Sequence, residues 1–456
     1  MDSFTKNMVV DSSWSFSDLT KKETSYASHG YHKYPAKFIP QLVKRLILEY
    51  SREGDLVLDP FGGCGTTLVE AKLNNRNSIS IDVNDAAILI ASAKAEAIDP
   101  AILETNNKLI LERIAKSNDH KDYYANANSR LKYWFKRKQF NKLFKIYNEI
   151  QRESDKNIKT FYNCCFSDIL KNCSKWYSKS IKPQRDSSKK DVEPAHAFIE
   201  HLNYMTKQNL EYYNLLDKSI NIVESSVKKA DARKTMLPKN SVDLIITSPP
   251  YAISYEYADI HQLSLLWFGS TKNIAGIRKD YIGTASKRKA IKSARIRSTR
   301  GLNTIKSLER LDTGLANQIA NYIVDLDLTF REMHRVLKHG KKMCIILGDT
   351  RYLGIKIPNT DMAIELINNA GFNINKVIKR KICSKIFTPY RDSTGKFSDG
   401  ESGKKRRIYQ YEYIIIAKKK LLLMDCGVRF FTYIYNKFLI SLQEAGNLAL
   451  WDKYDN

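Results

Sequence analysis

The sequence predicts an α/β protein built on a doubly wound parallel sheet that is interrupted by a large, mostly helical insertion. Short apolar runs alternate with helical patterns in the first hundred residues and again after about residue 240, and the stretch between them has helical periodicity alone. Strands that alternate with helices form βαβ units, which build parallel sheets. At 456 residues and 43% hydrophobic, the chain can bury a full-sized core.

The first βαβ unit is expected near the start of the chain. The run at 55–58 (DLVL) ends at Asp59-Pro60, as a buried strand does before a turn. A helix is expected from Thr66, where TTLVEAKLNNR has apolar residues at helical spacing, and residues 78–82 (SISID) predict a second strand ending on an acid. Three glycines lie between the first strand and the helix, where bare backbone lets a ligand approach closely. A cofactor is expected at this turn.

The remaining elements follow the same logic. Residues 84–227 carry long helical patterns rich in Leu, Ile, Tyr and Lys, which predict the insertion. A helix is expected over 319–337. Strand patterns are expected at 242–246, 343–347, 374–378 and 411–417. The final stretch, 421–456, is apolar and aromatic without a strand period, so we expect a C-terminal helical appendage.

The charge of the chain points to a polyanionic partner. Its 75 Lys and Arg against 49 Asp and Glu give a formal net charge of +26, which favours nucleic acid first and an anionic membrane second. No run of 18 apolar residues is present, and the first residues have neither the basic start nor the apolar core of a signal peptide. We therefore expect a soluble cytoplasmic protein, with no membrane partner.

The seven cysteines lack the CxxC pairing that is typical of structural zinc sites. Cys164, Cys165 and Cys173 could be grouped with His196, but adjacent cysteines are poorly spaced as metal ligands. We expect reduced thiols and no metal.

The segment DPFGGCGTT at 59–67 identifies a family. It lacks the Gly-Lys-Ser/Thr of a triphosphate-binding loop and the spaced glycines of a dinucleotide site. It resembles the first motif of amino-methyltransferases that act on DNA, which have a Rossmann-like class I methyltransferase fold and use S-adenosylmethionine. The resemblance implies that the acid Asp82, at the end of the second strand, meets the ribose hydroxyls of the cofactor. It also implies cofactor contacts within the motif, at Asp59, Pro60, Phe61, Gly62, Gly63, Gly65, Thr66 and Thr67.

Two further segments resemble cofactor motifs of the same family. Residues 32–38 (HKYPAKF) resemble the motif that packs on the methionine end of the cofactor, although such a segment can also be a solvated basic loop. Asp231 matches the spacing of an acid that meets the adenine amine, and its alternative role is to cap a turn. The first of these motifs implies contacts from Tyr34, Pro35, Lys37 and Phe38.

The segment TSPPY at 247–251 resembles the catalytic signature of N4-cytosine methyltransferases. The related N6-adenine enzymes more often carry Asp or Asn before the two prolines, so Ser248 favours cytosine and leaves adenine as the alternative. Pro249 and Pro250 can hold a rigid turn because their φ angles are fixed. By family analogy the Ser248 hydroxyl and the Pro249 carbonyl accept hydrogen bonds from the target amine. Tyr251 is the predicted stacking partner of a flipped base.

The segment 271–310 holds twelve Lys and Arg against only two acids, and we expect it to be a flexible loop that closes on DNA phosphates. The alternative is a solvated basic surface with no target. The insertion at 100–225, the basic loop and the segment 388–407 compete for the role of reading the bases. The phosphate-contacting residues expected in the loop are Arg278, Lys279, Lys287, Arg288, Lys289, Lys292, Arg295, Arg297 and Arg300.

The motif order, with the cofactor motif before TSPPY and a large insert between them, resembles the α arrangement of the family. It implies a cofactor-binding half at 1–99, an insertion that is a candidate target-recognition region at 100–225, and a catalytic half at 226–420. The implied activity is site-specific methylation of the exocyclic N4 amine of cytosine in duplex DNA, in association with the nucleoid and paired with a cognate restriction endonuclease. Methylation of the adenine N6 amine, methylation of RNA and DNA binding without catalysis are the alternatives.

Overall fold

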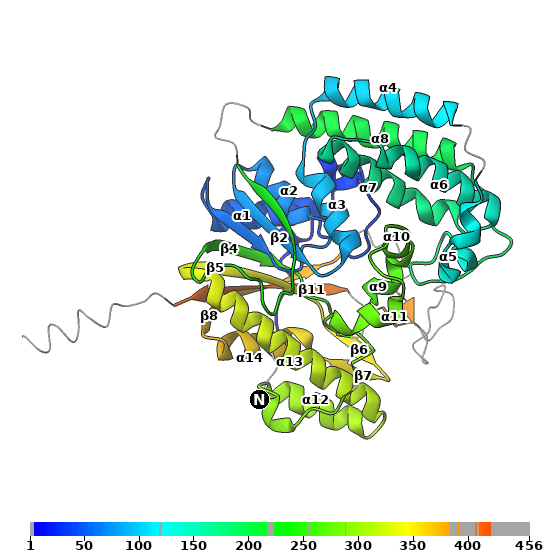
Figure 1. Ribbon diagram of the computed structural model, residues 1–456. Coiled ribbons are helices and arrows are strands. Elements are labelled where there is room, and N and C mark those ends of the chain that lie inside the picture. Colours follow the sequence, from blue (N-terminus) through cyan, green and yellow to red (C-terminus); the bar gives the residue numbers. More distant parts are fainter. Residues whose placement is uncertain are drawn as a thin grey trace, which may run out of the picture. The chain divides into compact units, whose positions relative to one another are not determined.

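A seven-stranded sheet, in the order β3-β2-β1-β4-β5-β11-β8, is the frame of the protein in the computed structural model (Figure 1). The structure describes residues 4–117, 121–216, 223–252, 255–287, 289–383, 390–391, 406–407 and 410–420. Residues 1–419 form one unit, which contains the sheet, and residues 420–456 form another. The appendage expected at 421–456 lies outside the described residues.

All strands of the sheet except β11 run in the same direction, and β11 pairs antiparallel with both β5 and β8. From β1 the chain adds β2 and then β3 on one side of the sheet, and from β4 onwards it adds strands on the other side. Ligands of doubly wound sheets bind at this switch point, outside the carboxyl ends of the strands. The strands are β1 (Leu56–Asp59), β2 (Asn77–Asp82), β3 (Ser225–Lys229), β4 (Val242–Thr247), β5 (Leu337–Leu347), β8 (Phe372–Lys381) and β11 (Tyr411–Lys419).

The predicted doubly wound sheet is confirmed, with two corrections. The sequence predicted a parallel sheet and did not indicate that β11 runs antiparallel, because an apolar run such as YIIIA indicates burial but not strand direction. The prediction that helical structure continues to residue 227 was wrong, because β3 begins at Ser225. β3 is an edge strand and its residues are exposed or half-buried, so its sequence SSVKK has almost no apolar signal.

Short two-stranded ribbons were also missed by the sequence patterns, because each strand has only two or three residues. They pair β6 (Thr350–Tyr352) with β7 (Ile355–Ile357), and β9 (Tyr390–Arg391) with β10 (Arg406–Arg407). The second ribbon lies in the segment 388–407, most of which is outside the described residues.

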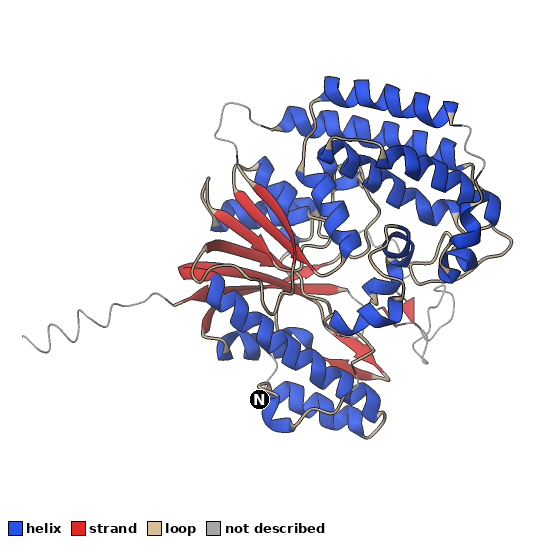
Figure 2. Cartoon of the chain, viewed as in Figure 1, coloured by secondary structure: helices blue, strands red, loops and turns tan. Residues whose placement is uncertain are grey.

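Helices cover both faces of the sheet (Figure 2). On one face the apolar side chains of α1, including Leu42 and Leu46, share a core with Leu244 and Ile246 of β4. On the other face, α13 and α14 share a core with Ile245, the β4 residue that points the opposite way. The covering helices are α1 (Pro40–Tyr50), α2 (Thr66–Leu73) and α3 (Asp85–Ala95) on one face, and α13 (Thr313–Val336) and α14 (Asn359–Asn369) on the other, with α12 (Thr299–Glu309) packed on α13.

The insertion is helical, as predicted, and has its own core in which Trp134 stacks on Trp176 at a ring distance of 5.0 Å. Its helix α7 packs on α3, and α10 brings Trp267 into the same core. Cys164 and Cys165 are buried there, whereas the side chain of His196 is 70% exposed. The elements are α4 (Pro100–Lys116), α5 (Ser129–Trp134), α6 (Arg137–Gln151), α7 (Lys156–Cys173) and α8 (Pro194–Leu215), followed after β4 by α9 (Tyr257–Ile260) and α10 (Gln262–Trp267).

The basic segment 271–310 was predicted to be a flexible loop, and this was wrong for much of its length. It contains α11 (Ile274–Ile277) and α12, with short 3-10 turns between them. Ile282 and Ile296 are buried in the core beside α13, so two apolar residues fix the charged segment to the sheet domain.

Within the described part of the chain, no helix is long and apolar enough to cross a membrane, and no cluster of His, Cys, Asp or Glu could hold a metal ion.

Gly65 provides a test of the turn that precedes α2. It is the N-cap of α2 with φ of +78°, and an added Cβ would lie 3.1 Å from the Cα of Ala91 in α3. Gly54 has the same φ of +78° with nothing within 4 Å of an added Cβ. We expect Gly65→Ala to lower the free energy of unfolding by about 1–3 kcal/mol, and Gly54→Ala by about 1 kcal/mol. Denaturant unfolding of both variants measures this difference, and equal losses would contradict the close approach of α2 and α3.

Candidate active site

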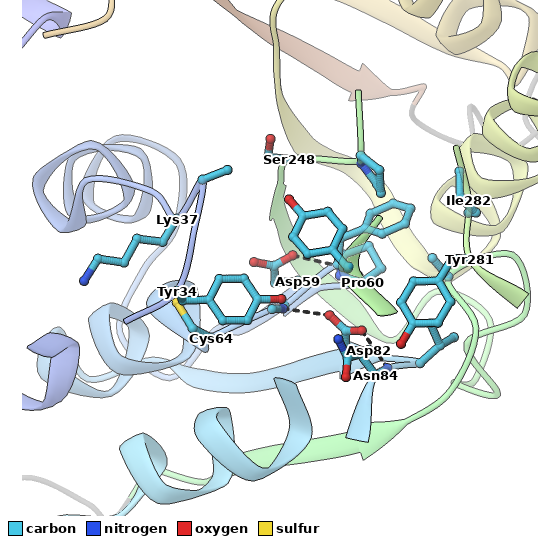
Figure 3. Close-up of a pocket in the computed structure, with 18 of the residues that line it drawn as sticks. Tyr34, Lys37, Asp59, Pro60, Cys64, Asp82, Asn84, Ser248, Tyr281 and Ile282 are labelled. Atoms are coloured by element: carbon cyan, nitrogen blue, oxygen red, sulfur yellow. Dashed lines mark hydrogen bonds between the residues drawn. The ribbon is translucent and has the colours of Figure 1, made fainter. Parts of the chain in front are cut away.

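A cavity opens at the carboxyl ends of β1, β2 and β4 (Figure 3). It encloses about 860 Å³, open solvent at its mouth included. Most residues predicted from the cofactor and catalytic motifs line it together: Tyr34, Lys37, Phe38, Asp59, Pro60, Phe61, Gly62, Gly63, Thr66, Asp82, Asp231, Ser248 and Pro250. The predicted residues that do not line it are Pro35, Gly65, Thr67, Pro249 and Tyr251.

The glycine turn brings bare backbone to the cavity wall. A Cβ on Gly62 would lie 1.8 Å from the Oγ of Ser80 in β2, so no side chain fits between the turn and the neighbouring strand. The Gly62 amide donates to the Ile81 carbonyl at 2.9 Å and fixes the turn against β2. The turn therefore needs glycine for packing as well as for access to a ligand.

Asp82 is held at the end of β2 with both carboxylate oxygens oriented by backbone. The Gly63 amide donates to its Oδ2 at 3.0 Å, and the Asn84 amide donates to its Oδ1 at 2.9 Å. Burial raises the pKa of Asp82 to about 6, although these hydrogen bonds oppose the shift. Figure 3 shows the carboxylate facing the cavity between Tyr34 and Tyr281, where it can accept further hydrogen bonds.

Asp59 lines the same cavity but is bound mainly by the protein itself. Its Oδ2 accepts from the Thr67 hydroxyl at 2.8 Å, and its Oδ1 accepts from the Thr247 hydroxyl at 2.6 Å. Burial raises the pKa of this carboxyl to about 6. Thr67, predicted to contact the cofactor, instead holds Asp59 in place.

The segment 32–38 is anchored, so its alternative as a solvated loop is wrong. The His32 ring hydrogen-bonds the Ser167 hydroxyl at 3.0 Å, and the Lys33 amide donates to Asp168 at 2.8 Å, which ties the segment to α7 of the insertion. Tyr34 then lies against the cavity, with its ring 4.8 Å from that of His261. Lys37 extends away from Asp82 (Figure 3), and its ammonium donates to the His29 carbonyl at 2.9 Å.

The far end of the cavity was predicted only in part. Asp231 lines it and also accepts from Arg233, whose backbone amide and guanidinium donate at 2.8 and 2.9 Å, so the acid caps a turn as well. Tyr281 and Ile282 also line the cavity and come from the basic segment, whose charge gave no sign of a cavity wall. The other lining residues that were missed are Ala36, Cys64, Val83, Asn84, Ala230, Ala232, Tyr257 and Asp280.

The catalytic motif forms the wall that faces the glycine turn. Ser248 and Pro250 line the cavity, and the Pro250 carbonyl accepts from the Tyr322 hydroxyl at 2.9 Å. Tyr251 turns towards β11, where its hydroxyl donates to Glu412 at 3.1 Å. The motif is therefore fixed on both sides of the proline pair, by Thr247 before it and by Tyr251 after it.

A family model described as DNA methylase matches residues 3–93 and 242–444, which together are well over half of the chain. The chain therefore belongs to this N6 and N4 amino-methylase family. Residues 94–241, which contain the helices of the insertion, lie between the two matched blocks.

The chain is also similar to individual proteins, at low sequence identity. The type II methyltransferase M.MvaI of Kocuria varians is 24% identical over 406 residues, covering 82% of this chain and 88% of its own. The type II methyltransferase M.MjaII of Methanocaldococcus jannaschii is 30% identical over 201 residues, 38% of this chain and 37% of its own. Among solved structures, TrmN from Thermus thermophilus is 11% identical, with 84% of this chain and 49% of that one covered and a TM-score of 0.28.

The chain is thus a DNA methyltransferase, and S-adenosylmethionine is its cofactor. The cavity fits this group. Four aspartates line it: Asp59, Asp82, Asp231 and Asp280. Among the described residues of its wall, Lys37 is the one Lys or Arg. An acidic wall of this kind suits a cofactor that carries a positively charged sulfonium. Asp82 can accept hydrogen bonds from hydroxyl groups of a ligand, and Tyr281 adds an aromatic surface to the cavity wall.

Asp82 should make the affinity for S-adenosylmethionine depend on pH. We expect the ionised carboxylate of Asp82 to accept two hydroxyls of the cofactor, so the affinity for S-adenosylmethionine should be high above the pKa of about 6 and should fall as the pH falls through it. Calorimetric titration should show binding about tenfold weaker at pH 5.0 than at pH 7.5, because about a tenth of such a group is ionised at pH 5.0. Asp82→Asn should bind weakly at both values. An unchanged slope in Asp82→Asn would assign the titration to Asp59 instead.

Proposed function

We propose that the enzyme transfers the methyl group of S-adenosylmethionine to the exocyclic N4 amine of cytosine in duplex DNA. One observation carries this proposal: Ser248 of the TSPPY motif lines the same cavity as the glycine turn and Asp82. The target amine and the cofactor can therefore meet between the motif and the turn. The family includes both N4-cytosine and N6-adenine enzymes, and the serine in place of Asp or Asn favours cytosine.

Methyl transfer to an exocyclic amine requires hydrogen-bond acceptors at that amine. The lone pair of an exocyclic aryl amine is delocalised into the ring, so acceptors on its two hydrogens make the nitrogen a better nucleophile. We assign these acceptors to the Ser248 hydroxyl and the Pro249 carbonyl. When bound, S-adenosylmethionine supplies an electrophilic methyl group, and the protein contributes mainly position and electrostatics.

A base in a duplex must leave the stack to reach this cavity. We propose that the flipped cytosine stacks on Tyr251. The ring of Tyr251 is fixed from two sides, since its hydroxyl is bound to Glu412 and its Cε2 would lie 3.1 Å from a Cβ added to Gly348. Because Tyr251 does not line the cofactor cavity itself, we propose that the base stacks on it beside this cavity.

The basic segment 271–310 supports DNA binding through only some of its predicted residues. Acidic partners already hold four of them: Arg278 pairs with Asp259, Lys287 with Asp325, Arg297 with Asp327, and Arg300 with Glu365. Arg288 lies outside the described residues. We propose that the phosphate contacts come from the exposed cations that form no ion pair within the described residues: Lys279, Lys289, Lys292 and Arg295.

The helical insertion remains our candidate for reading the target sequence. It presents exposed Tyr133 beside two guanidiniums, those of Arg130 and Arg185, each 5.1 Å from the ring centroid. Aromatic rings and arginines are the side chains that stack on bases and bind guanine edges. Because two relatives are type II methyltransferases, we further propose that the enzyme protects DNA from a cognate restriction endonuclease.

The base assignment is tested on the reaction product. Purified enzyme, unmethylated duplex DNA and labelled S-adenosylmethionine should yield labelled N4-methylcytosine after digestion to nucleosides. Ser248→Ala should lower kcat by about 10²- to 10³-fold, the loss expected when one positioned hydrogen-bonding group is removed, with cofactor binding retained. Ser241→Ala, whose hydroxyl bonds the Pro238 carbonyl, is the control. Labelled N6-methyladenine would overturn the base assignment, and label in RNA but not in DNA would overturn the substrate.

The phosphate contacts are tested by the salt dependence of DNA binding. Lys292→Ala/Arg295→Ala should reduce the slope of log affinity against log salt by about 0.9 for each phosphate that the variant no longer neutralises. The control is Lys108→Ala/Lys116→Ala on α4, on the opposite side of the unit from α12 (Figure 1), where each lysine pairs with a glutamate one turn away. An equal change of slope in both variants would mean that net charge alone, and no defined contact, governs binding.

A further inference from the structure

His261 is a buried histidine beside the cavity wall that no sequence motif includes. It lies at the junction of α9 and α10, and 6% of the residue is exposed. Its Nδ1 lies 2.8 Å from the side-chain nitrogen of Asn84, which follows β2 and lines the cavity. Its ring packs beside the rings of Tyr34 and Tyr257, which also line the cavity, at 4.8 and 6.3 Å. His261 therefore contacts three residues of the cavity wall without itself lining the cavity.

The direction of the hydrogen bond between Asn84 and His261 is fixed by the helix that Asn84 caps. As the N-cap of α3, the Asn84 side-chain oxygen accepts from the Ala86 amide at 3.0 Å, so the side-chain nitrogen is left to face His261. An amide nitrogen only donates, so Nδ1 of His261 accepts and the ring proton is on Nε2. A neutral ring agrees with its burial, which lowers the pKa of His261 to about 3.

The other ring nitrogen indicates that the imidazole is not present for packing alone. Nε2 of His261 has no hydrogen-bond partner among the residues that the structure describes. A buried donor without a partner is destabilising, and an apolar side chain of similar size would avoid this penalty. What the histidine offers, and an apolar side chain does not, is the acceptor at Nδ1 for Asn84.

Asn84 connects His261 to the carboxylate of Asp82. The backbone amide of Asn84 donates to Oδ1 of Asp82 at 2.9 Å. The side chain of Asn84 is held at both of its polar atoms, by the Ala86 amide and by His261, and it is 1% exposed. A residue held in this way has a fixed backbone as well, so the amide that orients Asp82 is fixed with it. Figure 3 shows Asn84 directly beside this carboxylate.

His261 is itself held in place from the side of the insertion. Oε1 of the next residue, Gln262, accepts from the Trp134 indole at 3.0 Å and from the Arg130 guanidinium at 2.9 Å, and both donors belong to α5. Trp134 is part of the core of the insertion. The helices of the insertion thereby fix the position of the ring nitrogen to which Asn84 donates.

We propose that His261 is a positioning residue for S-adenosylmethionine, which holds Asn84 and through it keeps the carboxylate of Asp82 in the orientation that the cofactor needs. The inference rests on the expected contact between Asp82 and the cofactor, and it is independent of which base is methylated. Its effect falls on the affinity for the cofactor and not on the rate of methyl transfer, because Asp82 takes no part in the transfer itself.

His261→Asn and His261→Leu form a matched pair, because asparagine and leucine have nearly the same shape and only asparagine can accept a hydrogen bond. Both variants lose the ring that packs beside Tyr34. In calorimetric titration, His261→Leu should bind S-adenosylmethionine about 5- to 30-fold more weakly than His261→Asn, the effect of leaving the buried Asn84 donor without its partner. The kcat values of the two variants at saturating cofactor should agree within about twofold. Equal Kd values, or a difference in kcat alone, would overturn the proposal.

The control for a general loss of stability is His334→Leu. His334 also packs against an aromatic ring, that of Phe372 at 5.1 Å, but it lies on α13 and does not line the cavity. This variant should keep the Kd for S-adenosylmethionine and the kcat of the unchanged enzyme, whatever stability it loses in denaturant unfolding. Cofactor binding weakened as much as in His261→Leu would show that reduced stability explains the effect, and the proposal would be wrong.

A double-mutant cycle with Asn84→Ser tests whether the effect of His261 passes through Asn84. Serine still serves as an N-cap for α3, but its side chain is too short to reach His261. In the Asn84→Ser background, His261→Leu and His261→Asn should therefore have Kd values within about twofold of each other. A ratio as large as in the presence of Asn84 would overturn the proposal.

The failure of this proposal can be told apart from that of the proposed function. Unchanged cofactor affinity in Asp82→Asn would overturn the proposal together with the expected contact between Asp82 and the cofactor. Labelled N6-methyladenine as the reaction product would overturn the proposed base and leave the role of His261 unaffected.

Discussion

The site depends on one buried carboxylate, that of Asp59, at the point where the order of the strands reverses. Its oxygens bind the hydroxyl of Thr67 at the start of α2 and that of Thr247 at the end of β4. One side chain thereby joins the cofactor turn to the strand that carries the catalytic motif. A buried polar group of this kind is costly unless it is fully bonded, so the two halves of the cavity are fixed relative to each other by the need to satisfy Asp59.

The net charge of the chain and the charge of the cavity wall are opposite in sign. The chain has a formal net charge of +26, yet its cavity is lined by four aspartates, Asp59, Asp82, Asp231 and Asp280. Positive charge outside favours a polyanionic duplex, and negative charge inside favours a sulfonium cofactor. The basic segment connects the two environments, because Tyr281 and Ile282 line the cavity while Lys279 beside them is exposed. Acidic partners of the segment, such as Asp325, hold part of its charge against the protein and leave the remainder for DNA.

The features that sequence could predict are those fixed by local chemistry. The glycine turn, Asp82 and TSPPY each follow a buried strand, and parallel strands bring their carboxyl ends to one edge, so their meeting in one cavity was foreseeable. The helical insertion was foreseeable from its period. Other features depend on tertiary context: β3 is polar because it is an edge strand, and Tyr281 lies in a segment whose charge suggested a loop. Thr67 lies within the motif, but only the fold shows that it binds Asp59 and not the cavity.

The antiparallel direction of β11 has a chemical consequence that no sequence pattern indicated. The parallel strands β4 and β5 deliver their carboxyl ends to the active edge, where Ser248 follows β4 and Gly348 follows β5. A strand that runs the opposite way delivers its amino end instead, and Tyr413 pairs there with Leu347, the last residue of β5. Glu412 therefore lies beside Tyr251, and β8, parallel to β5, places Arg380 directly opposite Glu412 in the register. Had β11 been parallel, Glu412 would lie at the other edge of the sheet, and the carboxylate that orients Tyr251 would have to come from elsewhere.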